Sequence, residues 1–235
     1  MKENSAIMEV NSQMIAAEAI DSMSSLTPMQ QELLFQTKKE QTFSALLAHQ
    51  LQVHVTPQDL RVLVELKGVD YEAKPSSKKS GPNSRNTHDI GILDKHADLN
   101  LLIENKVWYH FDGAKGSRAI RVEKSVKKQL QGDIFKLKHT ASHLDVQKCF
   151  ILINIVTPSQ PESLPKSYKQ EHEIVSKRTL GDLVRYRKEG LNGIRSVFDS
   201  RVTDFKSITH LASVNPMGVE GFGFHDVICA EIKIK

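Results

Sequence analysis

Two short segments of the sequence place two acidic residues and a lysine where strands could bring them together. HDIGIL contains Asp89, and LLIENKVW contains Glu104 and Lys106. Both segments have the apolar pattern of strands, in which side chains two positions apart project from the same face. Glu104 and Lys106 should therefore project together, with Asn105 on the opposite face. If the two segments pair as a hairpin, Asp89 lies beside Glu104.

Two carboxylates and a lysine on one sheet face could carry out metal-dependent phosphate chemistry. Mg²⁺ or Mn²⁺ prefers oxygen ligands, and one or two carboxylates suffice because water and a substrate phosphate complete the shell. Asp89 and Glu104 would be these ligands. A bound metal activates water and offsets charge on a phosphate under attack. Lys106 could orient the water, transfer a proton or stabilise the transition state, and the sequence leaves these roles open.

The elements predicted around these residues follow the order helix, three strands, helix, strand. We expect a helix from Thr27 to about residue 52, strands at about 59–68, 87–93 and 99–108, a helix over 118–140 and a strand over 148–156. The polar connection DKHAD between the second and third strands is typical of a hairpin. The last strand is nearly all apolar and follows a helix, so it should be buried on both faces and pair in parallel.

The segments outside this core have weaker patterns. Residues 5–24 favour a helix, Thr179–Glu189 favour a helix that Gly190 ends, residues 191–212 are ambiguous, and HDVICAEIKIK favours a final strand. A chain of 235 residues suits one elaborated domain. We therefore expect an α/β domain over 1–235, with its core at about 28–156, a helical N-terminal extension (1–27) and an α+β C-terminal elaboration (157–235).

HDIGIL, a polar turn and LLIENKVW together resemble the PD-(D/E)xK, or restriction-endonuclease-like, nuclease superfamily. In that superfamily an acidic residue lies early on one strand, E-x-K lies on the next, and a helix and a buried strand follow. The resemblance covers about residues 28–156 and implies a mixed sheet flanked by helices. It implies that Asp89, Glu104 and Lys106 form the catalytic core of an Mg²⁺- or Mn²⁺-dependent nuclease. His88 stands where the signature has proline.

The same resemblance implies two further site residues, a binding partner and a biological process. The helix after E-x-K often carries a glutamine that faces the site, which Gln129 resembles. The first core helix often brings a glutamate to the metal, and Glu40 stands in a suitable helix, although KKEQ is also typical of a solvated helix face. The partner implied is nucleic acid, with DNA favoured, in restriction, phage defence or repair. A homodimer or a partner protein is left open.

The distribution of positive charge fits such a partner. The net charge is +4 and the isoelectric point is about 8.9, which permits nucleic-acid binding without requiring it. Basic residues gather in two zones on either side of the predicted hairpin. We expect phosphate contacts from Lys78, Lys79, Arg85, Lys115, Arg118, Arg121 and Lys128. Some of these residues could instead merely solvate a helix face.

Two other function classes fit parts of the sequence. A nuclease-like fold could bind nucleic acid or protein without catalysis, and an exposed Glu-x-Lys could be a plain ion-pair ladder. The pairs His88-Asp89 and His225-Asp226 suggest an HD-type metal phosphohydrolase, whose ligands lie on helices. Gly91 and the β-branched residues after Asp89 favour a strand and argue against this class. HExxH, CxxC and Gly-rich phosphate loops are absent from the sequence.

Composition indicates the class of protein and its expected cellular location. Hydrophobic residues at 39% and charged residues at 26% are typical of a folded globular protein and argue against wholesale disorder. No apolar run approaches the ~20 residues that cross a bilayer as a helix. The first residues lack the pattern of a secretory signal, and Cys149 and Cys229 are expected to be reduced small hydrophobes. We therefore expect a soluble, cytoplasmic protein without a membrane partner.

Overall fold

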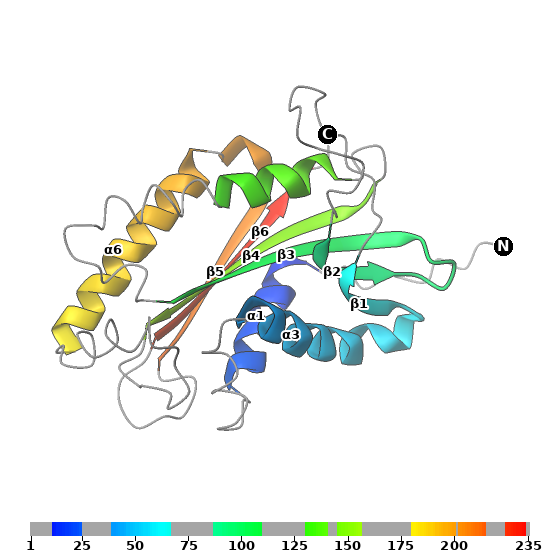
Figure 1. The fold of residues 1–235 in the computed structure, drawn as a ribbon, viewed down its shortest axis with the longest axis horizontal. Helices are drawn as coiled ribbons and strands as arrows, with labels where there is room; N and C mark the ends of the chain where they lie inside the picture. Colours follow the sequence, from blue (N-terminus) through cyan, green and yellow to red (C-terminus); the bar gives the residue numbers. More distant parts are fainter. Residues whose placement is uncertain are drawn as a thin grey trace.

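A six-stranded mixed β-sheet with helices on both faces forms the centre of the structure (Figure 1). This computed structural model describes residues 11–24, 39–66, 87–109, 130–140, 145–156, 180–200, 202–214 and 224–233. The strands lie across the sheet in the order β1-β2-β3-β4-β6-β5. The α/β class and the mixed sheet predicted from the sequence are therefore confirmed.

Three antiparallel strands form one half of the sheet. Strands β1 (Arg61–Leu66), β2 (His88–Leu93) and β3 (Leu99–Tyr109) pair in sequence order, and the pairing of β2 with β3 is the hairpin that the sequence predicted. Strand β4 (Gln147–Val156) pairs in parallel with β3, which confirms the predicted crossover. The sheet then continues antiparallel through β6 (Phe224–Ile232) to β5 (Phe205–Val214).

Helices cover the two faces of this sheet. Helices α1 (Ser12–Ser24) and α3 (Lys39–Val55) pack against one face. The helix at residues 130–139 and α6 (Leu180–Asp199) lie over the other face (Figure 1). Two 3₁₀ turns, at Thr56–Gln58 and Val202–Asp204, join α3 to β1 and precede β5. None of the described helices is long and apolar enough to cross a membrane.

Strand β4 is buried on both faces, as its apolar sequence predicted. Cys149, Ile151 and Ile153 belong to the core with α1 and α3. Phe150 and Leu152 belong to the core beneath α6 and the helix at 130–139. Because alternate strand residues serve opposite faces, one apolar strand contributes to two cores.

A tight turn fixes the register of the β2–β3 hairpin. Asp94 accepts hydrogen bonds at Oδ1 from the backbone N–H groups of His96 (2.8 Å) and Asp98 (2.9 Å). These bonds, that of Asp98 first, hold the pKa of Asp94 below its usual range. Ala97 takes the left-handed conformation, with φ of 66°, that closes the turn. This local chemistry sets which residues of β2 and β3 lie opposite each other.

Most predicted helices agree with the structure. Helix α1 lies within the predicted 5–24 segment, and α3 ends at Val55, close to the predicted end. Residues 130–139 are the described part of the helix predicted over 118–140. The predicted start of the first core helix at Thr27 lies outside the described residues. The predicted final strand is confirmed as β6.

The prediction that Gly190 ends a helix is wrong. Helix α6 continues through Gly190 and Gly193 to Asp199, into the segment that the sequence left ambiguous. A glycine inside a helix costs about 1 kcal/mol relative to alanine. Beyond it, helical spacing buries four apolar side chains, each worth about 1.5–3 kcal/mol: Leu191, Ile194, Val197 and Phe198. Tertiary packing therefore outweighs the local signal to stop.

Candidate functional site

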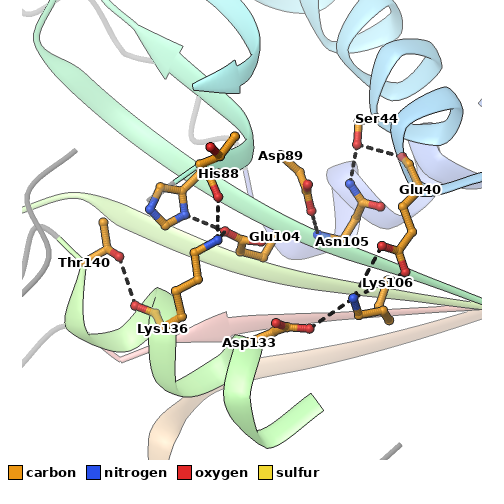
Figure 2. A network of polar contacts seen from close by, with 11 residues as sticks. Glu40, Ser44, His88, Asp89, Glu104, Asn105, Lys106, Asp133, Lys136 and Thr140 are labelled. Carbon is orange, nitrogen blue, oxygen red and sulfur yellow. Dashed lines mark hydrogen bonds and ion pairs between the residues drawn. The ribbon is translucent and has the colours of Figure 1, made fainter. Parts of the chain in front are cut away.

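Three of the residues predicted to act in catalysis, Asp89, Glu104 and Lys106, lie close together at the β2–β3 hairpin (Figure 2). The β2–β3 pairing begins at Ile90 and Ile103, and Asp89, the residue before Ile90, accepts a hydrogen bond from the backbone N–H of Asn105, next to Glu104. Asn105 faces the other way, where its Nδ2 donates a hydrogen bond to Ser44 Oγ (2.6 Å) on α3. The strand alternation expected from E-x-K is therefore confirmed, and Asp89 lies on a strand as predicted.

Lys106 joins two helices to the sheet. Its Nζ lies 3.3 Å from Oε1 of Glu40 on α3 and 3.3 Å from Oδ2 of Asp133 on the helix at 130–139. Burial lowers the pKa of Lys106, but Asp133 and Glu40 more than offset this and the pKa lies above its usual value. In this arrangement Lys106 stays protonated at neutral pH, which favours an orienting or charge-stabilising role over that of a base.

Glu104 is the most enclosed carboxylate of the group. It is 6% exposed, and its Oε1 lies 2.6 Å from Lys136 Nζ. Nδ1 of the fully buried His88 approaches the same oxygen to 2.6 Å, without hydrogen-bond geometry. Lys136 Nζ also donates to the main-chain oxygen of Thr87 at 2.5 Å. A lysine and a histidine thus lie beside the same carboxylate oxygen of Glu104.

Asp89 has the most perturbed electrostatic environment in the site. Its Oδ2 accepts a hydrogen bond from the backbone N–H of Asn105 (2.8 Å). Burial, followed by the charge of Glu104, nevertheless raises the pKa of Asp89 from 3.8 to about 7. The backbone bond and Lys136 offset only part of this rise. An additional cation beside Asp89 would restore its ionised form.

These side chains form a group that is rich in negative charge. We call the following residues the acid–lysine cluster: Glu40, Asp89, Glu104, Lys106, Asp133 and Lys136. Four carboxyl groups face two ammonium groups in it, and the charge of Glu104 adds to the effect of burial in raising the pKa of Asp89. No three His, Cys, Asp or Glu side chains in the described ranges converge as ligands of one metal ion. The lysines draw Glu104 and Glu40 toward themselves instead.

The cluster nonetheless suits a divalent cation. The Asp89 carboxylate lies at the backbone of Asn105, next to Glu104, and Mg²⁺ needs only one or two protein carboxylates beside water and substrate oxygens. Lys136 Nζ marks a point that already has two oxygen atoms within 2.6 Å, from Glu104 and Thr87. A positive charge is thus accommodated there. Glu40, the third ligand expected, lies at the cluster but is paired with Lys106.

Of the residues predicted to act, Asp89, Glu104, Lys106 and Glu40 are brought together. The remaining candidates lie outside the described residues: Gln129, Lys78, Lys79, Arg85, Lys115, Arg118, Arg121 and Lys128. Sequence reasoning missed Thr87, Asp133 and Lys136, and it considered His88 only for the HD-type alternative. Asp133 and Lys136 stand four and seven positions after Gln129, which is the spacing of one helix face. That spacing could have pointed to them.

Asp226, from the second His-Asp pair of the sequence, takes part in ion pairs outside the acid–lysine cluster. Asp226 on β6 is fully buried and accepts hydrogen bonds from Arg187 Nε (2.8 Å) and Nη2 (2.6 Å) on α6. His210 Nε2 on β5 lies 2.9 Å from Asp226 Oδ1. Burial raises the pKa of Asp226, but Arg187 and His210 more than offset this and the pKa lies below its usual value. Both His-Asp pairs lie on strands, unlike the helical ligands of HD-type enzymes.

Arg187→Met is expected to lower the free energy of unfolding by roughly 2–4 kcal/mol, because it leaves a buried carboxylate without its main partner. The pKa of Asp226 is depressed in the folded state, so this stabilisation is present at neutral pH and is lost as the pH falls below about 4. Urea unfolding at pH 7 and at acid pH measures both effects. Arg195→Met, at an exposed position of the same helix, is the control. Equal stability of both variants at pH 7 would contradict the assignment.

No known family of proteins matches the chain, and no curated protein or solved structure is significantly similar to it. Any function assigned to the protein therefore rests on the geometry of the acid–lysine cluster.

Proposed function

We propose that the protein is a metal-dependent nuclease of the PD-(D/E)xK type, which hydrolyses phosphodiester bonds of nucleic acid, with DNA favoured. One observation carries the proposal: Asp89 on β2 accepts a hydrogen bond from the backbone of Asn105, the residue between Glu104 and Lys106, which share a face of β3. The order of helix, three strands, helix and parallel strand around them supports it. Restriction, phage defence and repair are the settings in which such an activity would fit.

Each residue of the site has a role in this proposal. Asp89 and Glu104 would hold Mg²⁺ or Mn²⁺, with Glu40 as a further ligand. The metal would activate water and offset negative charge on the scissile phosphate. Lys106, held protonated between Glu40 and Asp133, would orient the phosphate or stabilise its developing charge. Gln129, which directly precedes the described helix of Asp133 in the sequence, remains a proposed catalytic residue.

Both basic segments are joined to the site through the chain. Residues 67–86 lead directly into Thr87, whose carbonyl oxygen accepts a hydrogen bond from Lys136 of the cluster. Residues 110–129 connect Tyr109 at the end of β3 to the helix at 130–139. Phosphate groups of a bound strand would be contacted from these segments by Lys78, Lys79, Arg85, Lys115, Arg118, Arg121 and Lys128.

A second candidate function is a nuclease-like module that binds nucleic acid or protein without cleaving it. The observation that favours it is the pairing of Glu104 with Lys136 and of Glu40 with Lys106. These pairs give the cluster a structural use that needs no metal. The two functions differ in whether a divalent cation binds at Asp89 and whether a substrate is cut.

The proposal predicts cleavage that requires a divalent cation and both carboxylates. Purified protein is incubated with plasmid, linear duplex, single-stranded DNA and RNA, in Mg²⁺ or in chelator. Cleavage of at least one substrate is expected in Mg²⁺ alone. Asp89→Ala and Glu104→Ala should lower metal affinity and cleavage together, since each removes a negatively charged ligand.

Asp204→Ala is the matched control for these variants. Asp204 is also paired with a lysine of the helix at 130–139, Lys138, but lies outside the cluster. This variant should keep both metal binding and cleavage. A wild-type protein that binds nucleic acid and cuts none of the four substrates would support the binding module instead.

A further inference from the structure

We propose that the ammonium group of Lys136 occupies the inner cation position of this site and is displaced from it when a divalent cation binds. The proposal concerns the regulation of the proposed nuclease site and rests on metal binding there, though not on cleavage. It adds Thr87 to the ligands of that position.

The position is defined by two oxygen atoms around one point. Lys136 Nζ lies 2.6 Å from Glu104 Oε1 and 2.5 Å from the main-chain oxygen of Thr87. Carboxylate and carbonyl oxygens are the donors that hard divalent cations prefer. Glu104 lies on β3 and Thr87 immediately precedes β2, so both oxygens lie near the start of β2. Glu104 is almost fully buried, so the site keeps this ligand whether the cation is an ammonium group or a metal.

The ammonium group of Lys136 and a divalent cation differ in how much carboxylate charge they can neutralise. The single charge of Lys136 lies against Glu104, whereas the partner that the described part of the chain offers Asp89 at hydrogen-bond distance is the backbone N–H of Asn105. A divalent cation brings two charges to the same place and can pair with both carboxylates. This difference favours the metal over the lysine whenever the metal is present at sufficient concentration.

Lys136 is also able to leave. Its side chain is 28% exposed, while the Glu104 side chain is 7% exposed and that of His88 is fully buried. The long lysine side chain can turn toward solvent on its helix, whereas Glu104 and His88 cannot move without opening the core. Glu104 and His88 are thus fixed parts of the site, whereas the Lys136 side chain can leave it. The released ammonium group then lies beside the site, where a substrate phosphate can pair with it.

Calorimetric titration with Mn²⁺, in the absence of nucleic acid, tests the displacement. Lys136→Met removes the competing charge and keeps most of the side-chain volume, so the variant should bind Mn²⁺ about tenfold or more tightly than the parent protein. Lys138→Met is the control, because Lys138 lies two residues along the same helix and pairs with Asp204. Its affinity should equal that of the parent. Equal or weaker binding by Lys136→Met, or no binding by either protein, overturns the proposal.

A second measurement uses the unaltered protein and does not depend on whether a variant folds. Amine acetylation followed by peptide mass spectrometry reports how accessible each lysine is. Reaction at Lys136 should rise at least about twofold in saturating Mn²⁺, while Lys138, of similar exposure, should stay unchanged. Unchanged reaction at Lys136 overturns the displacement.

The outcomes also separate this inference from the proposed function. Tighter binding by Lys136→Met in a protein that cuts no substrate keeps the lysine displacement and rejects the nuclease. Cleavage by a parent protein whose Lys136→Met variant binds Mn²⁺ equally keeps the nuclease and rejects the displacement.

Discussion

Replacing Lys106 by alanine is expected to lower the single-turnover rate of cleavage by roughly 10²- to 10⁴-fold, the usual contribution of a positioned catalytic group. Metal binding should persist or become stronger. Removing the ammonium group leaves Glu40 and Asp133 without their shared partner and makes the site more negative. A residue that acts on the phosphate thus differs from a metal ligand, whose loss lowers affinity and cleavage together.

Calorimetry with Mg²⁺ and single-turnover cleavage on the same preparations measure the two effects. Lys138→Ala, which removes a lysine paired with an aspartate outside the cluster, should cleave at the parental rate. Circular dichroism checks that each variant folds. A Lys106→Ala variant that cleaves as fast as the parent would make the E-x-K match a coincidence and remove the main support for the nuclease.

The second large effect is on stability. Asp89→Asn is expected to raise the free energy of unfolding of the metal-free protein at pH 8 by at most about 4 kcal/mol, at about 1.4 kcal/mol per unit of pKa shift. The pKa of Asp89 rises from 3.8 to about 7 in the folded state. Asparagine carries no charge to bury, and its side-chain oxygen can still accept the hydrogen bond from Asn105 N–H.

The stability of the parent protein depends on pH because the pKa of Asp89 is raised in the folded state. Because the folded-state pKa lies above the unfolded value, the parent protein loses stability as pH rises from about 4 to about 7, and the loss is constant above that. Urea unfolding in chelator at pH 5 and pH 8 should show a stabilised variant mainly at pH 8. The same variant should lose metal binding and cleavage, so stability and function change in opposite directions.

Asp94→Asn provides the control on the same hairpin. The pKa of Asp94 is lowered by hydrogen bonds from Asp98 and His96, so this substitution should not stabilise the protein at pH 8. If Asp89→Asn and the parent unfold at the same urea concentration at both pH values, Asp89 does not carry a buried, unbalanced charge.

Strands were predictable because their signals are local. The polar DKHAD connection between two apolar runs predicts the β2–β3 hairpin, and period-two alternation predicts that Glu104 and Lys106 share a face. The run at 148–156 predicts a strand buried on both sides, as β4 is. In each case, the residues that decide the structure lie within a few positions of one another.

The end of α6 was not predictable in this way. Gly190 is a local signal to stop, and it is outweighed by the burial of Leu191, Ile194 and Phe198 against β4 and β5. That burial depends on strands far away in the chain. A local pattern therefore fails where a small local cost competes with a larger energy from distant contacts.

The sequence by itself determined the strand hairpin, the side-chain types of the site and the face on which Glu104 and Lys106 stand. Only the tertiary structure decided the partners of those side chains. Asp133 and Lys136 reach the site because their helix packs over β3, and Glu40 reaches it from α3. The pKa of Asp89 likewise depends on burial and on a charge from the neighbouring strand. Electrostatic interactions act through space, so the order of residues along the chain does not contain them until the fold brings the charges together.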